Sequence, residues 1–299
     1  MRKKLMGFAR LARPANLPTA AADILAGAAI GNYFAPTASF NFLMDNPQKL
    51  FLLVLSSVCL YAGGVVFNDV FDAKLDAIER PERAIPSGLI PSLQAVVWGV
   101  FLILSGIVLA FNVYLLSGIV SLLLVAAIFA YDAYLKQNSF FGPLSMGVCR
   151  GLNLILGISI VGALIWWWIA IIPVLYIFAI TLISRGEVHG NNKNHIIWAG
   201  VLYTIVIALI TFTIATQTYN LMLAFPFLLL FTFLVFSPLV KAYKINSPEH
   251  IKKAVISGVL SLVVMDACWT VGFSSWYIGL GVLLLLPLSI LLSKLFAVT

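Results

Sequence analysis

Residues 51–67 read FLLVLSSVCLYAGGVVF, a stretch without a single charged side chain. An apolar run of about 20 residues is long enough to cross the hydrocarbon core of a bilayer as an α-helix. Runs of this kind recur along the whole chain, and the sequence predicts ten membrane spans. These are residues 15–35, 48–70, 91–111, 113–133, 141–161, 163–183, 195–216, 220–240, 253–273 and 276–297.

The composition excludes a soluble domain. Hydrophobic residues make up 62% of the 299 residues and charged residues only 10%, whereas soluble domains carry about 45–50% and about 25%. We therefore predict one all-α domain over residues 1–299. It is a polytopic membrane bundle of nine or ten transmembrane helices with a small cytoplasmic cap formed by the charged connections.

The basic residues indicate the orientation of this bundle. Sixteen of the eighteen Lys and Arg residues fall in the N-terminal tail, in alternate connections and at the C-terminal end. Loops rich in Lys and Arg stay on the cytoplasmic side of a membrane. We expect a multi-pass protein of the plasma (inner) membrane with both termini cytoplasmic. The net charge of +7 reflects this asymmetry, and no basic arm with interleaved aromatic residues points to nucleic acid as a partner.

The second span ends in a group of polar residues. Residues 68–76 read NDVFDAKLD, so Asn68, Asp72 and Asp76 are four residues apart. In a continuous helix such positions rotate by only about 40° and form one polar stripe. Carboxylate oxygens are the ligands that Mg²⁺ prefers, together with water and substrate phosphates. The alternative is a solvated helix end, but the like charges of Asp72 and Asp76 repel each other there.

The following loop adds donors for an anion. Arg80 and Arg83 lie in the stretch RPERAIPSG, residues 80–88, and the planar guanidinium group of arginine donates to phosphate oxygens in pairs. Residues 69–90 hold five of the eleven acids of the chain, which marks this loop as the candidate site of the chemistry.

These two strings resemble the first aspartate-rich motif of the UbiA superfamily of intramembrane prenyltransferases, with a spacing most similar to that of chlorophyll synthases. Arg13-Pro14 before the first span is similar to the opening of that family. The resemblance implies Mg²⁺ as cofactor and a prenyl diphosphate whose lipid tail lies within the bundle. It implies transfer of the polyprenyl group to a lipophilic acceptor. The residues assigned to metal, diphosphate and catalysis are Asn68, Asp72 and Asp76, with Asp69 as a supporting metal carboxylate and Arg80 and Arg83 as diphosphate donors.

Two later segments extend the resemblance. The fourth predicted span ends in YDAYLK, residues 131–136, which is similar to the family's ending of that helix. Lys136 would then contact diphosphate, or it is an ordinary basic anchor at the membrane surface. The family places its second aspartate-rich motif after the sixth span, where this chain reads SRGEVHGNNK, residues 184–193.

This second motif departs from the family pattern. Ser184 and Asn191 stand where many relatives have aspartates, and Glu187 is the acid that remains. We expect Glu187 to be a metal ligand, with His189 as a weaker candidate. The altered loop resembles an EboC-like branch of the superfamily.

Three charged residues, Asp23, Arg150 and Asp266, lie well inside predicted spans and away from their ends, where a charge costs at least about 2.5–3.5 kcal/mol. Arg150 is expected either to pair with a carboxylate of another helix or to bind diphosphate. Two other functions remain open at this point. One is a non-catalytic carrier or scaffold that has kept the bundle, and the other is an ion-coupled transporter that uses the three charges as a relay.

We predict that Asp72→Ala and Asp76→Ala each abolish Mg²⁺-dependent binding of a prenyl diphosphate, because both side chains should face the cytoplasmic pocket and contribute to the metal site. Binding to purified protein is measured with and without Mg²⁺, and elution from a gel-filtration column in detergent reports folding. An equal loss of folded protein would mark the two residues as structural.

Overall fold

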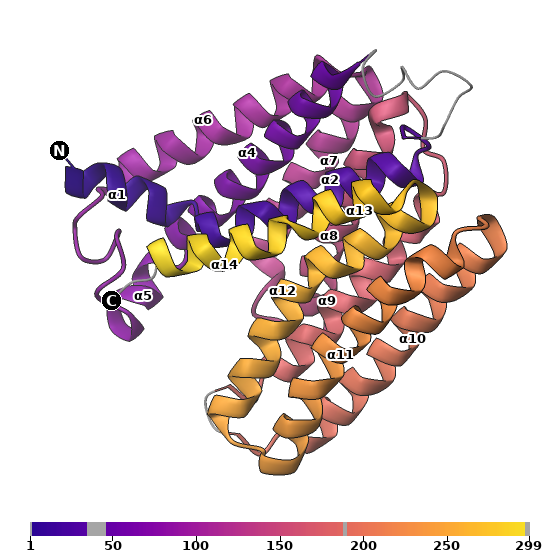
Figure 1. Ribbon diagram of the computed structural model, residues 1–299. Helices are drawn as coiled ribbons and strands as arrows, with labels where there is room; N and C mark the ends of the chain where they lie inside the picture. Colours follow the sequence, from indigo (N-terminus) through magenta and orange to yellow (C-terminus); the bar gives the residue numbers. More distant parts are fainter. Residues whose placement is uncertain (1, 35–45, 188–189, 297–299) are drawn as a thin grey trace.

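The structure is a computed structural model that describes residues 2–34, 46–187 and 190–296, and all regular elements within these ranges are helices (Figure 1). The predicted all-α fold is therefore confirmed. The elements are α1 (Arg2–Leu11), the 3₁₀ turn η1 (Pro14–Asn16), α2 (Leu17–Ile30), α4 (Pro47–Phe71), α5 (Ala73–Glu79), α6 (Ser92–Phe111), α7 (Leu115–Ala130), the π-helical turn η2 (Tyr131–Leu135), α8 (Phe141–Ile158), the 3₁₀ turns η3 (Ser159–Val161) and η4 (Trp167–Ala170), α9 (Ile171–Ser184), α10 (Lys193–Gln217), α11 (Leu221–Ile245), α12 (Pro248–Phe273), α13 (Trp276–Leu283) and α14 (Leu285–Phe296).

Nine stretches of the described residues are long and apolar enough to cross a membrane, and they correspond to the second to tenth predicted spans. The first predicted span, 15–35, appears as the 14-residue helix α2, most of which is buried among its neighbours. At 1.5 Å per residue α2 is about 21 Å long, so it is shorter than the bilayer core. The prediction of nine or ten helices is thus confirmed, with α2 as the short one.

Proline residues explain where two helices break. The segment before Pro14 was expected to be a tail, but it forms α1, which ends before Arg13 turns into a left-handed conformation at φ 44°. The last predicted span is divided into α13 and α14 at Leu284, three residues before Pro287. Proline lacks an amide hydrogen and its ring clashes with the carbonyl of the residue four positions earlier, here Leu283.

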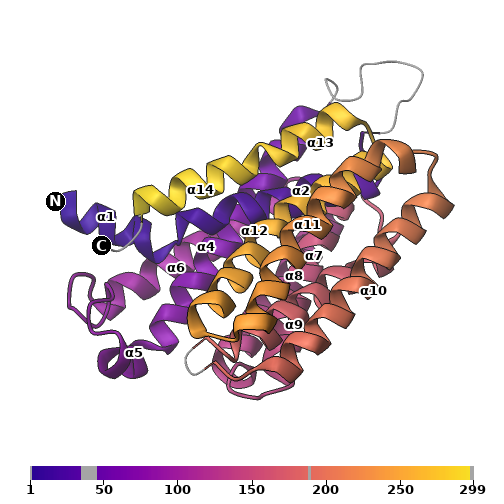
Figure 2. The same cartoon turned by 60° about the horizontal axis from the view of Figure 1, so that its bottom comes forward.

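The two ends of the chain lie together. Figures 1 and 2 show both termini at the end of the bundle that carries α5. Helix α14 packs along η1 and α2, and the Ser289 hydroxyl donates to the carbonyl of Ala15. The C-terminal helix therefore holds the start of α2 in place, next to the polar end of α4.

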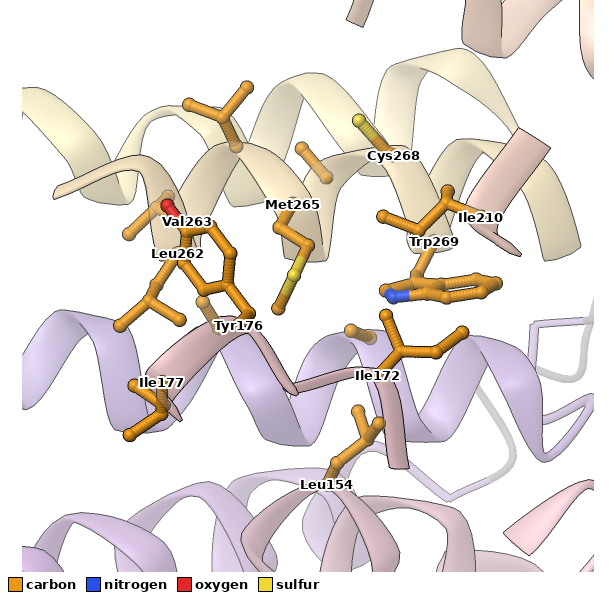
Figure 3. Packing of buried hydrophobic residues seen from close by; sticks show 14 of the residues in the cluster. Leu154, Ile172, Tyr176, Ile177, Ile210, Leu262, Val263, Met265, Cys268 and Trp269 are labelled. Atoms are coloured by element: carbon orange, nitrogen blue, oxygen red, sulfur yellow. The ribbon is translucent and has the colours of Figure 1, made fainter. Parts of the chain in front are cut away.

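Helix α12 forms the centre of the hydrophobic core. Its residues Met265 and Trp269 lie beside Tyr176 and Ile172 of α9 (Figure 3), and all four side chains are almost completely buried. Burial of large apolar and aromatic side chains between helices gives the close packing that fixes their relative positions. This core positions α2, α8 and α9 around the cavity described below.

Glycine residues permit a close backbone contact between α2 and α8. A Cβ atom placed on Gly27 would lie 2.4 Å from the carbonyl oxygen of Leu154, and one on Gly157 would lie 2.7 Å from the carbonyl oxygen of Ile24. Small residues at such crossings let two membrane helices approach backbone to backbone.

A second, smaller core holds the loop after α5 in place. Leu11 of α1 packs in one cluster with Ile85 and Ile90 of the loop and with Val66 of α4. These contacts fold the loop and α1 back onto the end of α4. They bring the basic residues of both segments close to residues 68–76.

We predict that Gly27→Ala destabilises the bundle by about 1–3 kcal/mol, because the added methyl group meets backbone atoms that have no free space to move into. Thermal unfolding in detergent measures the effect. Gly281→Ala is the matched control, since Gly281 also lies in a helix but has nothing within 4 Å of the added atom. Equal midpoints for the two variants would contradict the tight α2–α8 contact.

Candidate active site

The polar residues at the end of α4 keep the spacing that the sequence predicted. Helix α4 ends at Phe71 and α5 begins at Ala73, with Asp72 between them. The amide of Asp72 donates to the carbonyl of Asn68 at 3.0 Å, and the amide of Asp76 donates to that of Asp72 at 2.8 Å. The four-residue hydrogen-bonding pattern therefore continues through the junction, although the helix itself is interrupted there.

Each aspartate of this segment forms an ion pair with a base from another part of the chain. Asp69 Oδ1 lies 2.7 Å from Arg13 Nη2 and 3.4 Å from Arg83 Nη1, and Asp76 Oδ2 lies 2.6 Å from Arg83 Nη1.

Asp72 pairs with Lys136, which comes from the end of η2. The aspartates therefore do not form an isolated acidic stripe. Each of them lies beside a base at the end of α4.

This arrangement fits a metal ion together with a diphosphate. Within the described residues no three His, Cys, Asp or Glu side chains converge as a metal-binding cluster. Mg²⁺ sites, however, commonly use only one or two carboxylates, with substrate phosphates and water as the other ligands. The oxygen donors of Asn68, Asp72 and Asp76 suit that chemistry. The bases beside them suit the phosphate oxygens.

Two cavities meet at Arg13. The first has a volume of about 380 Å³ and is lined by Arg10, Arg13, Asp69 and Arg83, among others. The second, of about 280 Å³, lies deeper and is lined by both polar and apolar side chains. Arg13 and Asn16 line both cavities. The outer cavity, called the mouth below, thus contains three arginines and two acids and adjoins a more apolar inner cavity.

The inner cavity has a mixed lining. Its apolar part includes Leu124, Ile128, Ile177, Val259 and Leu262, and its polar part includes Asn68, Asp132, Arg150 and Asn153. The polar groups gather on α4, η2 and α8, whereas α9 and α12 contribute aliphatic side chains. Such a space suits a ligand with an anionic head and a hydrocarbon tail.

Arg150 pairs with carboxylates of other helices. Its Nε lies 2.8 Å from Asp23 Oδ2 and its Nη2 lies 3.7 Å from Asp266 Oδ2, and the guanidinium also donates to Thr19. Asn153 donates to Asp23 at 2.8 Å. The interhelical pair was one of the two expectations for Arg150. Because the residue also lines the inner cavity, its role in diphosphate binding stays a prediction.

The described residues of the altered second motif, 184–187 and 190–193, line neither of the two cavities. Glu187 is half-buried, and its burial raises the pKa of the carboxyl group, while the positive charges of Lys252 and Arg80 lower it. Arg80 is therefore near Glu187, whereas Arg83 faces the aspartates. His189 lies outside the described residues. The predicted roles of Glu187 and Arg80 in metal and diphosphate binding stay predictions.

Two residues of the site did not stand out as site residues in the sequence. Arg13 was noted only as part of an Arg-Pro opening, and its contact with Asp69 spans 56 positions. Asp132 was noted only within the string YDAYLK, and it accepts a hydrogen bond from Asn68 Nδ2 at 2.7 Å. Both belong to segments whose sequences resemble the family, Arg13-Pro14 and residues 131–136. The charged character of Asp132 inside a predicted span was the signal available.

The fold and site define a class of protein, namely a helical membrane bundle with aspartates paired to bases at the end of α4 and a cavity of mixed polar and apolar lining inside. The model of the UbiA prenyltransferase family matches residues 24–255. The chain belongs to this family, and the suspected resemblance is confirmed at that level.

Proteins of known name are similar to parts of the chain. The digeranylgeranylglyceryl phosphate synthase of Sulfurisphaera tokodaii is 35% identical over 144 residues, which are 48% of this chain and 51% of the relative. The synthase of Metallosphaera sedula is 33% identical over 175 residues, which are 57% of this chain and 61% of the relative. The chain thus spans about half to three fifths of the length of the curated relatives it matches.

Solved structures share the fold. The structure of a digeranylgeranylglyceryl phosphate synthase aligns with this chain at a TM-score of 0.67 and 19% identity. The alignment covers 91% of this chain and 99% of the synthase. A UbiA homolog from Archaeoglobus fulgidus bound to GPP and Mg²⁺ aligns at a TM-score of 0.63 and 15% identity. This alignment covers 84% of this chain and 99% of the homolog. At these identities the likeness concerns the fold.

We predict that Arg83→Ala weakens diphosphate binding about tenfold or more and leaves its dependence on Mg²⁺ intact. Arg83 is the base that contacts both Asp69 and Asp76, and hydrogen bonds to charged groups contribute about 1.5–3 kcal/mol. Calorimetric titration with geranyl diphosphate, with and without Mg²⁺, measures both effects.

Lys74→Ala removes an exposed base of α5 and serves as the control for net charge. Arg83→Lys keeps the charge but lacks the forked geometry, so an intermediate affinity is expected. Equal affinities for Arg83→Ala and Lys74→Ala would show that Arg83 does not contact the diphosphate.

Proposed function

We propose that this protein is a Mg²⁺-dependent prenyltransferase that moves a polyprenyl group from a prenyl diphosphate to a lipophilic acceptor. The observation that carries the proposal is the set of aspartates paired with bases at the end of α4. Arg13, Asp69 and Arg83 of this set line the outer cavity, and Arg13 also lines the inner one. Membership of the UbiA prenyltransferase family supports it, and so do the names of the relatives.

The bases of the mouth would hold the diphosphate. Arg13, Arg83 and Lys136 already lie against carboxylates, so they are held in position before a ligand arrives. Binding exchanges carboxylate partners for phosphate oxygens, and the aspartates become free for the metal. Donors that are fixed in advance stabilise the negative charge that develops on the leaving pyrophosphate. Arg80 and Arg150 are further proposed donors.

The metal ligands proposed are Asn68, Asp69, Asp72, Asp76 and Glu187. Bound Mg²⁺ supplies Lewis-acid neutralisation of the diphosphate and so favours cleavage of the bond to the prenyl C1 carbon. The residues of this chain orient the diphosphate at the cavity mouth, so that the prenyl tail enters the interior.

The interior would stabilise and protect the reacting carbon. Tyr61 and Tyr131 line the inner cavity near Asn68, and aromatic faces attract the positive charge of an allylic cation. The aliphatic lining keeps bulk water away from that cation. The acceptor then attacks C1 directly, and no covalent intermediate on the protein is required.

The relatives suggest which acceptor to test first. Their name, digeranylgeranylglyceryl phosphate synthase, describes a product with two geranylgeranyl groups on glyceryl phosphate. We propose a prenylated glyceryl phosphate as the first acceptor class for this chain. Acceptors of the chlorophyll-synthase type and those of an EboC-like branch follow from the sequence motifs alone. We also propose that the charged mouth and both termini face the cytoplasm.

The two alternative functions are less well supported. A carrier or scaffold would not need the full set of paired aspartates and bases. A transporter relay was suggested by Asp23, Arg150 and Asp266, and these residues do meet. Arg150 pairs with both carboxylates in one interhelical contact, which explains why the three residues meet without a relay.

We expect the purified protein to release pyrophosphate only when Mg²⁺, a prenyl diphosphate and an acceptor are all present. The panel contains dimethylallyl, geranyl and geranylgeranyl diphosphates, each with geranylgeranylglyceryl phosphate or a lipophilic phenol, and mass spectrometry identifies the product. Binding of the diphosphates without any product across the panel would favour the carrier. Absence of both binding and product would contradict the proposed function.

A further inference from the structure

The second motif lacks the acids that the family pattern places at Ser184 and Asn191, and Glu187 is the acid that remains. The hydroxyl of Ser184 donates to the carbonyl of Thr181 at 2.9 Å, so it is bound within its own helix. Asn191 is exposed and has a left-handed backbone, with φ 55°. None of the described residues among 184–191 lines the outer or the inner cavity.

A different carboxylate lines the inner cavity. Asp132 lies in the π-helical turn η2, where the amide of Lys136 donates to the carbonyl of Tyr131 at 3.0 Å, five residues back. Two side chains from this wider turn contact the end of α4, Asp132 of η2 and Lys136 of its C-cap. Lys136 reaches Asp72, and Asp132 bonds to Asn68. Single π-helical turns often occur at functional sites.

The carboxylate of Asp132 forms no ion pair with any of the described residues. Asp23, Asp76, Asp132 and Asp266 are the buried carboxylates of the described residues, and all except Asp132 form an ion pair with an arginine. Asp132 is only 4% exposed and lines the inner cavity. A buried carboxylate without a cationic partner is unfavourable, so the position calls for a cation when the site is in use.

We propose that Asp132 is the carboxylate ligand that replaces the missing acid of the second motif in holding Mg²⁺, together with Asn68 and Asp72. The inference rests on the proposed function. Asp132 contacts Asn68 directly, and it is close enough to Asp72 and Lys136 for their charges to act on it. Oxygen donors from α4 and η2, with diphosphate oxygens and water, make a suitable set for this ion.

The first experiment measures metal binding rather than turnover. Mn²⁺ replaces Mg²⁺ as a paramagnetic probe, and the full-length protein in detergent is titrated with Mn²⁺ in the presence of geranyl diphosphate. We expect Asp132→Asn to weaken Mn²⁺ binding at least tenfold. The asparagine keeps the size of the side chain and an oxygen that accepts the hydrogen bond from Asn68.

Two further variants complete this experiment. Glu79→Gln removes an exposed acid of α5 and should change the affinity less than twofold. Glu187→Gln should weaken binding less than Asp132→Asn does. Should Asp132→Asn fail to fold, judged by thermal unfolding, Asp132→Ser is expected to fold with the same loss of metal affinity.

The second experiment separates a ligand from a residue that merely positions Asn68. Asp132→Cys offers a thiolate, which prefers Cd²⁺ over Mg²⁺. We expect this variant to gain Cd²⁺ affinity in the presence of geranyl diphosphate and to show the ultraviolet absorbance of a cadmium thiolate. The parent protein is the control, because its own Cys149 lines the same cavity.

Three results would overturn the proposal. If the parent binds Mn²⁺ with geranyl diphosphate and Asp132→Asn binds it equally well, Asp132 is not a ligand, and the proposed function is unaffected. If Asp132→Asn loses affinity but Asp132→Cys shows no cadmium thiolate, Asp132 positions Asn68. If the parent itself binds no Mn²⁺ with the diphosphate, the proposed function fails as well.

Discussion

Three aspartates lie close together at the end of α4 because bases from distant parts of the chain neutralise them. Arg13 precedes α2, Arg83 lies in the loop after α5, and Lys136 follows η2. Without these partners the repulsion among Asp69, Asp72 and Asp76 would disfavour the helical turns that carry them. The small core around Leu11 and Ile90 holds two of the basic segments in place. The site therefore depends on the packing of α1 and of the loop.

A second charge cluster joins the helices below the mouth. Asp23 of α2, Arg150 of α8 and Asp266 of α12 meet in the buried interior of the bundle. A pair buried in this way adds little net stability compared with apolar packing, but removal of one partner leaves an uncompensated charge. The cluster therefore specifies how the three helices face one another, and it holds Arg150 at the wall of the inner cavity.

The second motif shows how a family fold can persist while polar residues at its helix ends differ. The helices that would carry the motif, α9 and α10, are present in their expected places, and solved relatives share the arrangement at low sequence identity. Packing of apolar side chains maintains such a fold and tolerates extensive substitution. The polar residues at the helix ends are free to differ, because they contribute more to binding than to the core.

The sequence alone determined the membrane bundle, most of its spans and the first motif. The thickness of the bilayer sets the length of each apolar run, and the helical period sets the spacing of Asn68, Asp72 and Asp76, so both are visible in local patterns. Only the tertiary structure showed that Arg13 meets Asp69 across 56 positions and that Asp132 bonds to Asn68 across 64. These pairings depend on how helices pack and on where a π-helical turn directs a side chain. No local pattern in the sequence encodes such long-range contacts.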